Sequence, residues 1–551
     1  MQLYREYLEQ ADFGSYEDYL KNFQINAPAH FNFAYDVLGK LANETPDAIA
    51  LEWCNVAGEK RTFTFADIDR ESSKAANLFV SMGIKKGDAV MLVLKRHYQF
   101  WFAIMGLHKI GAITVPATHL LTKKDIIYRC EAASVKMIVA TAEGVFHQQC
   151  DLAMSECPTV EKRMSVRGDV EGWINFDAEL EKQSADFPRP LPLNENSDPL
   201  LLYFTSGTSG MPKMVIHDCS YPLGHIQTAA FWQQCIDGGL HLTVSETGWA
   251  KSVWGKLYGQ WLCGSAIMVY DFEKFVAKDL LNIVANYHVT TFCAPPTIYR
   301  FMMLEEGVKQ LDLSALKHCS VAGEPLSPEV FEGWLKLTGV PLREAFGQTE
   351  LCVTIGTFPW MKSIPGSMGK PSPQFDVDVV DEDGKSVAAG VVGEIVVRTR
   401  KMPIGMFGGY YRDDERTASV WANDVYHTLD LAWRDEWGYY WYVGRADDVI
   451  KSSGYRIGPF EVESALMEHP SVLETAITGV PDEVRGAVVK ATIVLRPGFE
   501  PSDELIKDLQ SHVKRTTAPY KYPRIIEFVS ELPKTISGKI RRVELRERDS
   551  K

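Results

Sequence analysis

The sequence predicts an α/β protein, with a large N-terminal domain of several subdomains and a small α+β domain at the C-terminal end. Short apolar runs alternate with helix-like segments in the first part of the chain, an order typical of largely parallel sheets flanked by helices. A glycine and charge cluster at 444–458 then separates two patterned regions. The chain of 551 residues is long enough for about three or four structural units.

In the N-terminal part, the apolar runs at 88–94, 111–116 and 136–141 have the length of buried strands. The segment 65–82 is predicted to be a helix, because Ile68, Ala75 and Phe79 can share one face. This alternation predicts sheets with helices packed on them.

Beyond the cluster, 459–468 is predicted to be helical, and 474–479 and 488–495 are predicted to be strands. Another helix follows Ser502, a suitable N-cap, with apolar residues at helical spacing up to Val513. A last strand at 524–529 leads into a basic tail. Such a unit of about a hundred residues is large enough to fold alone.

Charge and cysteine content narrow the function classes. The net charge of −14 argues against a broad nucleic-acid surface, so an anionic substrate must meet local cations, for which Lys213, Arg445, Arg456 and Lys539 are candidates. The ten cysteines are scattered without a C-x-x-C pair, as expected of buried residues in a reducing compartment. No secretory signal and no apolar run near eighteen residues is found, so we expect a soluble, cytoplasmic protein without integral membrane association.

The segment 201–213 is an apolar run that breaks into hydroxyls and glycines and closes on Lys213. Gly207 and Gly210 leave backbone N–H groups free to converge on an anion, which suits a polyphosphate. It is not a P-loop, which needs another glycine spacing and a hydroxyl after the lysine, where this chain has Met214. Taken alone, the segment leaves phosphate binding and a solvated linker both open.

Five further blocks follow in order, at 323–325, 344–350, 444–451, 453–459 and 533–539. Together with 201–213 they resemble the adenylate-forming superfamily, which includes acyl-CoA synthetases, adenylation domains of peptide synthetases and luciferases. The resemblance spans nearly the whole chain, and 452–463 is most similar to the medium-chain acyl-CoA synthetase branch. It implies an N-terminal domain at 1–446 and a mobile C-terminal lid at 447–551, with the hinge at Asp447.

The implied reaction converts a carboxylate, a poor acyl donor, into an acyl adenylate. Two anions must then approach each other, which requires a bridging metal, N–H donors on the polyphosphate and a cation at the developing charge. By resemblance, Glu350 holds Mg2+, for which oxygen ligands are preferred, and Thr349 contacts the α-phosphate. A helix N-terminus with an acidic first turn is the alternative for these two residues. The ATP phosphates are assigned to Thr205, Ser206, Gly207, Thr208, Ser209, Gly210 and Lys213.

The resemblance also implies an adenosine site. Asp430 binds the ribose hydroxyls with Arg445 nearby, although the family's Thr-Gly-Asp reads Thr428-Leu429-Asp430 here, a change that bears on the local backbone. The adenine and its surroundings are assigned to Gly323, Glu324, Pro325, Phe346, Gly347 and Gln348.

The near-terminal Lys539 is implied to bridge the carboxylate and the α-phosphate, although by spacing alone it reads as part of a basic surface tail. Thioester formation with coenzyme A then needs a second lid position, because one rigid site cannot present both Lys539 and the thiol. In that position Gly454 lets pantetheine pass close to the backbone, and Arg456 contacts a nucleotide phosphate or CoA.

Acetate-specific relatives carry a bulky aromatic residue where this chain has Gly347, so we expect space for a longer acid. The wall of the acyl pocket is predicted within 247–256 and 293–296. There Trp249 and Trp254 are also ordinary core candidates, and Lys256 either snorkels to the surface or limits the pocket and pairs with a substrate carboxylate. We expect a straight or 2-branched acid of short to medium length.

The sequence thus predicts an ATP-dependent acyl-CoA synthetase, an acid-thiol ligase that forms AMP and pyrophosphate. An aryl-CoA (benzoate-type) ligase, or an enzyme that loads a carrier-protein thiol, shares almost every motif. A nucleotide-binding protein without catalysis is disfavoured, because Lys539, Glu350 and Lys213 are all present. Monomer and homodimer are both open.

Overall fold

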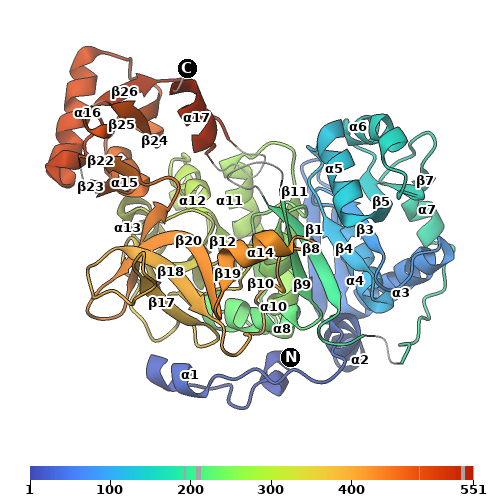
Figure 1. Ribbon diagram of the computed structural model, residues 1–551. Coiled ribbons are helices and arrows are strands. Elements are labelled where there is room, and N and C mark those ends of the chain that lie inside the picture. Colours follow the sequence, from blue (N-terminus) through green and yellow to red (C-terminus); the bar gives the residue numbers. More distant parts are fainter. Residues whose placement is uncertain (192–193, 206–211, 454, 483, 535–539, 550–551) are drawn as a thin grey trace.

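The computed structural model describes residues 1–191, 194–205, 212–453, 455–482, 484–534 and 540–549 (Figure 1). Most of the chain is built on two large sheets with helices around them, and the C-terminal part forms a small unit beside them. The predicted mixed α/β class is confirmed. Among the described residues, no helix combines the length and apolar character needed to cross a bilayer.

The first sheet has seven strands in the order β7-β6-β5-β3-β4-β8-β9. Its strands are parallel except for β9, which runs antiparallel to β8. The strands predicted at 88–94, 111–116 and 136–141 are present, and the helix predicted at 65–82 is α3, which begins with a capping box between Thr64 and Asp67. The elements of this region are β3 (Ala89–Val93), β4 (Ile113–Pro116), β5 (Val135–Thr141), β6 (Lys162–Val166), β7 (Ile174–Asn175), β8 (Pro199–Thr205), β9 (Lys213–Asp218), α1 (Tyr16–Asn22), α2 (Lys40–Glu44), α3 (Phe65–Ser81), α4 (Gln99–Ile110), α5 (Lys123–Ala133), α6 (Phe146–Ala153) and α7 (Phe176–Leu180).

The second sheet has fourteen strands. A parallel part formed by β1 and β10 to β14 continues into an antiparallel part formed by β15 to β21. Its elements are β1 (Ile49–Asn55), β2 (Lys60–Thr64), β10 (Leu240–Thr243), β11 (Ala266–Asp271), β12 (Thr291–Ala294), β13 (His318–Val321), β14 (Leu342–Phe346), β15 (Ile355–Gly356), β16 (Ser367–Pro371), β17 (Asp376–Val380), β18 (Gly393–Arg398), β19 (Trp421–Ala422), β20 (Val425–Arg434), β21 (Tyr440–Arg445), α8 (Tyr221–Ile226), α9 (Ala250–Gly255), α10 (Tyr258–Leu262), α11 (Ala277–Asn286), α12 (Pro296–Met303), α13 (Pro328–Thr338) and α14 (Asp414–Val420).

The parallel strands place their carboxyl ends along a common edge of each sheet. The segments predicted to form the site follow these ends: Thr205 closes β8, 247–256 follows β10, 323–325 follows β13 and 347–350 follows β14. In open α/β sheets, ligands bind beyond the carboxyl ends of the strands. The topology therefore collects segments that are far apart in the sequence.

The small C-terminal unit stands apart from the sheets in Figure 1 and has its own buried cluster, drawn from 450–513. The predicted helices and strands are present, and Ser502 caps α16 by accepting a hydrogen bond from the N–H of Leu505 at 3.1 Å. A hairpin of β22 and β23 and a terminal helix, α17, were not predicted. The elements are β22 (Ile450–Ser452), β23 (Tyr455–Ile457), α15 (Pro459–Met467), β24 (Val472–Asp482), β25 (Gly486–Leu495), α16 (Asp503–Thr516), β26 (Ile525–Phe528) and α17 (Arg542–Asp549).

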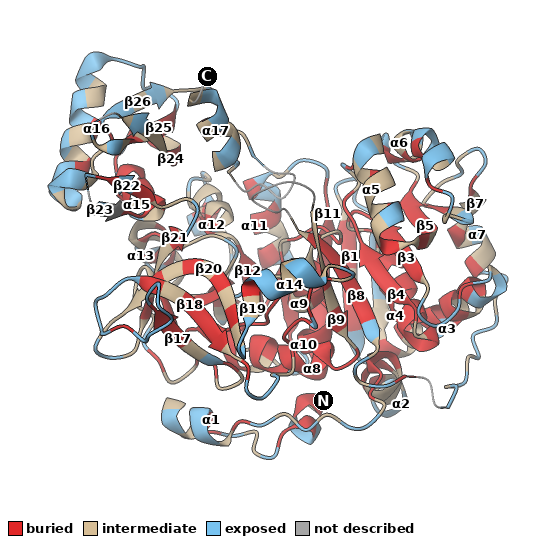
Figure 2. Ribbon diagram, viewed as in Figure 1, coloured by how far each residue is buried: buried red, intermediate tan, exposed pale blue. Residues whose placement is uncertain are grey.

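The interior of the two large sheets is apolar. Figure 2 shows β3, β4, β5 and β8 as buried, whereas exposed residues concentrate on the outer helices and loops. All ten cysteines are buried and free, as predicted for small core residues.

Candidate active site

A buried carboxylate marks one end of the candidate site. Asp430 lies on β20 directly opposite Arg445 on β21, and it is 5% exposed. It accepts hydrogen bonds from Gln348 Nε2 at 2.5 Å and the Tyr442 hydroxyl at 3.0 Å, and Arg445 Nη1 lies 3.4 Å away. Burial and the Asp430 carboxylate raise the pKa of Tyr442 well above its ordinary value, so the phenol stays a donor. Three donors thus fix one acceptor group beside the end of β14.

Leu429 adopts the backbone conformation that the family's glycine would favour. Its φ of +60° lies in the left-handed region, which costs a residue with a Cβ about 1–2 kcal/mol. Two hydrogen bonds hold it there: its N–H donates to Glu394 Oε1 at 2.9 Å, and its carbonyl accepts from the N–H of Ala446 at 2.9 Å. The departure from Thr-Gly-Asp therefore leaves the turn before Asp430 in place.

A second cluster joins Lys213, Tyr410 and Glu350. Lys213 begins β9, and its Nζ lies 3.3 Å from the Tyr410 hydroxyl and 5.0 Å from the centroid of that ring. The same hydroxyl donates to Glu350 Oε1 at 2.9 Å. Burial and the Glu350 carboxylate both raise the pKa of Tyr410, so the phenol keeps its proton. Burial lowers the pKa of Lys213, an effect that Glu350 opposes.

Tyr410 was not among the residues predicted from the sequence. It lies in the loop between β18 and α14, where no periodic pattern exists, and the only local signal is the preceding pair Gly408 and Gly409. The structure makes this tyrosine the link between two residues that were predicted.

The segment 348–350 connects the two clusters. The carbonyl of Thr349 accepts a hydrogen bond from His217 Nε2 at 2.7 Å, and the carbonyl of Glu350 accepts from the N–H of Phe407 at 2.8 Å. Burial lowers the pKa of His217 to about 4, so its ring is neutral, and it stacks on Tyr221 with centroids 3.8 Å apart. The alternative of a helix N-terminus is wrong, because Thr349 and Glu350 form a turn after β14.

The segment assigned to adenine follows β13. Gly323 has a φ of +99°, and the Glu324 carboxylate accepts a hydrogen bond from Thr297 Oγ1 at 2.7 Å. Behind it, burial raises the pKa of Glu344 to about 8, and this side chain accepts a hydrogen bond from the N–H of Leu326. Phe346 ends β14 with its ring 6.5 Å from that of Tyr442. Pro325 is partly buried next to this segment.

Gly347 does not face the open space expected from the sequence. A Cβ at this position would lie 2.8 Å from the carbonyl oxygen of Cys352. The glycine is therefore explained by the close approach of the chain at 347–352, and a side chain would require this turn to move.

The structure also differs from what we expected of Lys256. Its side chain is buried rather than snorkelling, and its Nζ donates to the carbonyl of Ser245 at 2.6 Å. Burial, and then the nearby Arg96, lower its pKa to about 7. Because the amine is satisfied inside the core, a role as partner of a substrate carboxylate is not supported.

The tryptophans of the predicted acyl pocket lie at the start and near the end of α9. Trp249 precedes the helix and Trp254 lies within it, 5.9 Å from Trp232, and both are partly buried. Lys251, between them, donates to the carbonyl of Ala322 at 3.0 Å, which joins α9 to the segment that contains Gly323. The acyl and adenine segments are therefore neighbours.

Several predicted residues lie outside the part of the chain that the structure describes: Ser206, Gly207, Thr208, Ser209, Gly210, Gly454 and Lys539. Their roles stay predictions. The same holds for the side chain of Arg456, whose backbone pairs with Lys451 in the hairpin of β22 and β23. Thr205 and Lys213 are opposite each other in the register of β8 and β9, so this strand pair fixes both ends of the predicted phosphate loop.

The predicted hinge lies between two sets of contacts. On the N-terminal side, Arg445 Nε is 3.7 Å from the Asp447 carboxylate. On the other side, the Asp448 carboxylate pairs with Arg542, at 3.7 Å, and with Arg546, both from α17. Asp448 is thus held by the C-terminal unit.

Two family models match the chain. The model of the AMP-binding enzyme matches residues 39–411, and the model of the AMP-binding enzyme C-terminal domain matches residues 461–539. The chain belongs to the AMP-binding enzyme family. The family resemblance and the fold class predicted from the sequence are confirmed.

Relatives of this AMP-binding enzyme include two mitochondrial acyl-coenzyme A synthetases of Homo sapiens. ACSM3 is 40% identical, over 98% of this chain and 93% of that protein, and ACSM5 is 41% identical, over 95% and 91%. Among solved structures, the anthranilate CoA ligase AuaEII in complex with anthranoyl-AMP has a TM-score of 0.88 at 28% identity, covering 95% of this chain and 98% of that one. An acyl-CoA synthetase of Brucella canis has a TM-score of 0.74 at 29% identity, covering 97% and 99%.

The buried Lys256 predicts a pH-dependent stability. Its amine titrates near pH 7 in the folded enzyme and near 10.5 when unfolded, so the unfolded state binds more protons between these values and stability rises with pH there, by at most about 1.4 kcal/mol per pH unit. In Lys256→Met this contribution is absent. The melting temperature of Lys256→Met minus that of wild type should therefore be larger at pH 7 than at pH 9.5.

Differential scanning fluorimetry at both pH values measures this gap. Lys124→Met, at an exposed lysine of α5, is the matched control and should show no such trend. A gap for Lys256→Met that stays constant with pH would contradict the assignment.

Proposed function

We propose that the chain is an ATP-dependent acyl-CoA synthetase, which forms an acyl adenylate and then the acyl-CoA thioester with release of pyrophosphate and AMP. The proposal depends on one observation above all. The cluster of Lys213, Tyr410 and Glu350 suits phosphates and a metal, the cluster around Asp430 suits ribose hydroxyls, and the turn 348–350 joins them. Membership of the AMP-binding enzyme family and the acyl-coenzyme A synthetases among its relatives support it.

In the first half-reaction a carboxylate oxygen of the acid attacks the α-phosphorus of ATP. A new oxygen–phosphorus bond forms, and the bond to the leaving pyrophosphate breaks. Asp430 accepts hydrogen bonds from the ribose hydroxyls, and the ammonium group of Lys213 binds the polyphosphate. Their preset positions reduce the cost of bringing two anions together.

Mg2+ fits the residues present. Glu350 is a carboxylate that is 9% exposed, with Oε1 bonded to Tyr410, and a hard cation takes carboxylate and water oxygens as ligands. When bound, the ion neutralises phosphate charge and stabilises the leaving pyrophosphate. Thr349, whose carbonyl is fixed by His217, would direct its own hydroxyl to the α-phosphate.

The second half-reaction requires the thiol of CoA to reach the same carbonyl carbon. We infer a lid at 447–551 that turns about Asp447, because Asp448 is already tied to α17. Lys539 serves the first position of the lid, and Gly454 and Arg456 serve the second.

For the substrate we propose a straight or 2-branched acid of short to medium length. Trp249 precedes α9 and Trp254 lies within it, and Lys251 between them contacts the segment that contains Gly323, so the two indole rings would provide an apolar wall of the acyl pocket. An aryl acid is the second candidate, because AuaEII, an anthranilate CoA ligase, shares the fold with a TM-score of 0.88. The third candidate is an enzyme that loads the acyl group onto a carrier-protein thiol.

A cytoplasmic location stays a prediction, because ACSM3 and ACSM5 are named as mitochondrial proteins. Monomer and homodimer are both compatible with the proposal.

The function is tested by pyrophosphate release over a panel of acids, with and without CoA. We expect release with butyrate, hexanoate or 2-methylbutyrate that increases when CoA is added, and weaker release with benzoate. Highest turnover with benzoate would select the aryl alternative. Absence of release with every acid would contradict an adenylating enzyme.

Lys539→Ala should lose most adenylation while thioester formation from a supplied acyl adenylate survives. The physical reason is that the ammonium is needed only while the carboxylate and the α-phosphate approach. Rapid-quench measurement of each half-reaction separates the two. An equal fall in both rates would show that the lysine does not act on adenylation alone.

Tyr410→Phe should weaken Mg·ATP binding about tenfold, because a hydrogen bond to a charged group contributes roughly 1.5 kcal/mol while the ring beneath Lys213 is kept. Isothermal titration calorimetry with Mg·ATP measures the affinity. Tyr411→Phe, at the next residue in the chain, is the control and should bind like wild type. Unchanged affinity in Tyr410→Phe would remove the tyrosine from the site.

A further inference from the structure

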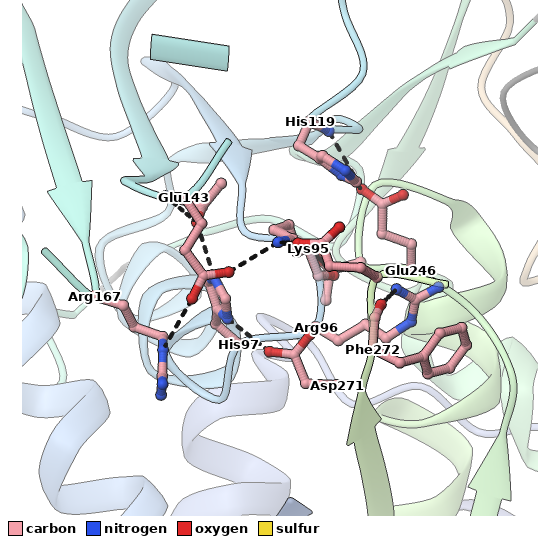
Figure 3. A network of polar contacts seen from close by, with 12 residues as sticks. Lys95, Arg96, His97, His119, Glu143, Arg167, Glu246, Asp271 and Phe272 are labelled. Atoms are coloured by element: carbon pink, nitrogen blue, oxygen red, sulfur yellow. Dashed lines mark hydrogen bonds and ion pairs between the residues drawn. The ribbon is translucent and has the colours of Figure 1, made fainter. Parts of the chain in front are cut away.

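A histidine and a glutamate join the two large sheets at their carboxyl edges (Figure 3). His119 follows β4 of the seven-stranded sheet, and Glu246 follows β10 of the fourteen-stranded sheet. His119 Nδ1 lies 3.1 Å from Glu246 Oε1, and the backbone N–H of His119 donates to the same oxygen at 3.3 Å. No role has been assigned to this pair so far.

The carboxylate of the pair is firmly placed. Glu246 is 7% exposed, and its second oxygen accepts a hydrogen bond from Thr118 Oγ1 at 3.1 Å. Arg96 and Lys256 are the cations near it, and Asp271 is the other nearby carboxylate. Glu246 accepts hydrogen bonds from Thr118 and from the backbone N–H of His119, and an acceptor at this place selects the histidine tautomer with the proton on Nδ1.

This tautomer leaves the lone pair of His119 on Nε2. Among the residues that the structure describes, none bonds this nitrogen, and the side chain is 18% exposed. The neighbouring pair of His97 and Asp271 differs, because His97 is 1% exposed and its Nε2 is taken by Thr141 Oγ1 at 2.9 Å (Figure 3). His119 therefore has the arrangement of a carboxylate-oriented general base, and His97 does not.

The pair lies beside the predicted acyl pocket. A Cβ on Gly248 would be 2.4 Å from the backbone nitrogen of Thr118, so the two loops touch, and the N–H of Trp249 donates to the carbonyl of Glu246 at 3.2 Å. From there Lys251 continues the contact to the adenine segment. A continuous series of contacts through 246–251 thus connects His119 with the place where the acyl adenylate would lie.

We propose that His119, oriented by Glu246, accepts the thiol proton in thioester formation. The inference rests on the proposed function. The sulfur forms a bond to the acyl carbon, the bond from that carbon to the phosphate oxygen breaks, AMP leaves with that electron pair, and the thiol proton passes to Nε2 and then to solvent. The thiolate is the nucleophile, and only a few per cent of a free thiol is ionised at pH 7, so an acceptor at this point has a large effect.

The test is a single-turnover reaction of CoA with a supplied acyl adenylate of the best acid in the panel. We expect His119→Gln to slow thioester formation about 100-fold at pH 7, while pyrophosphate release in the absence of CoA, the affinity for CoA and the melting temperature match wild type. At pH 9 a free thiol is largely ionised without help, so the defect should shrink several-fold. His469→Gln, at a histidine 3.1 Å from Asp508 in the C-terminal unit, is the matched control and should react like wild type.

His119→Ala supplies an independent measurement, because added imidazole should restore part of its thioester rate. A thioester rate equal to wild type in His119→Gln, or a defect that is the same at pH 7 and pH 9 with no rescue of His119→Ala, would overturn the inference. If wild type itself makes no thioester from the adenylate and CoA, the proposed function fails instead, so the two failures are distinguishable.

Discussion

The parallel order of the strands is the constraint on which the candidate site depends. Strand β8 of one sheet and strands β10, β13 and β14 of the other pair in parallel with their neighbours, so their carboxyl ends lie at the same edge of each sheet. The parallel register explains how Thr205, Glu324 and Glu350, far apart in the chain, all lie at or just beyond the carboxyl ends of strands, where we propose that they serve one ligand. Strand pairing also positions Asp430 against Arg445, so much of the precision of the site comes from backbone hydrogen bonds.

Buried and partly buried charged side chains determine the electrostatics of this edge of the sheets. Asp430, Glu350 and Lys213 are wholly or partly withdrawn from water, and each is held by hydrogen bonds to neutral donors or acceptors, such as Gln348 and Tyr410. Withdrawing a charge from water is costly, so such groups are retained where the fixed charge is useful. In an enzyme that must bring two anions together, dipoles and charges fixed before the substrate arrives need little reorganisation in the transition state.

Regular elements were predictable because their signals are local. The strands β3, β4 and β5 and the helix α16 follow from apolar spacing and a serine N-cap, and the order of the family blocks indicated the site. Tyr410 could not be predicted, since a loop residue has no period. Lys256 was misjudged because sequence patterns do not reveal burial, and Gly347 because the nearby carbonyl of Cys352 is visible only in three dimensions. Leu429 shows that a left-handed turn can survive without glycine when two hydrogen bonds hold it.

The central claim is that one nucleotide spans the distance from Asp430 to Lys213, with its phosphate beside the turn 348–350. A crystal structure of the enzyme with an acyl-sulfamoyl adenosine, a stable analogue of the acyl adenylate, tests this claim most directly. We expect both ribose hydroxyls within hydrogen-bond distance of the Asp430 carboxylate and the sulfamoyl group next to Thr349, on the side of Lys213. An analogue bound with its ribose away from Asp430, or at another edge of the sheets, would contradict it.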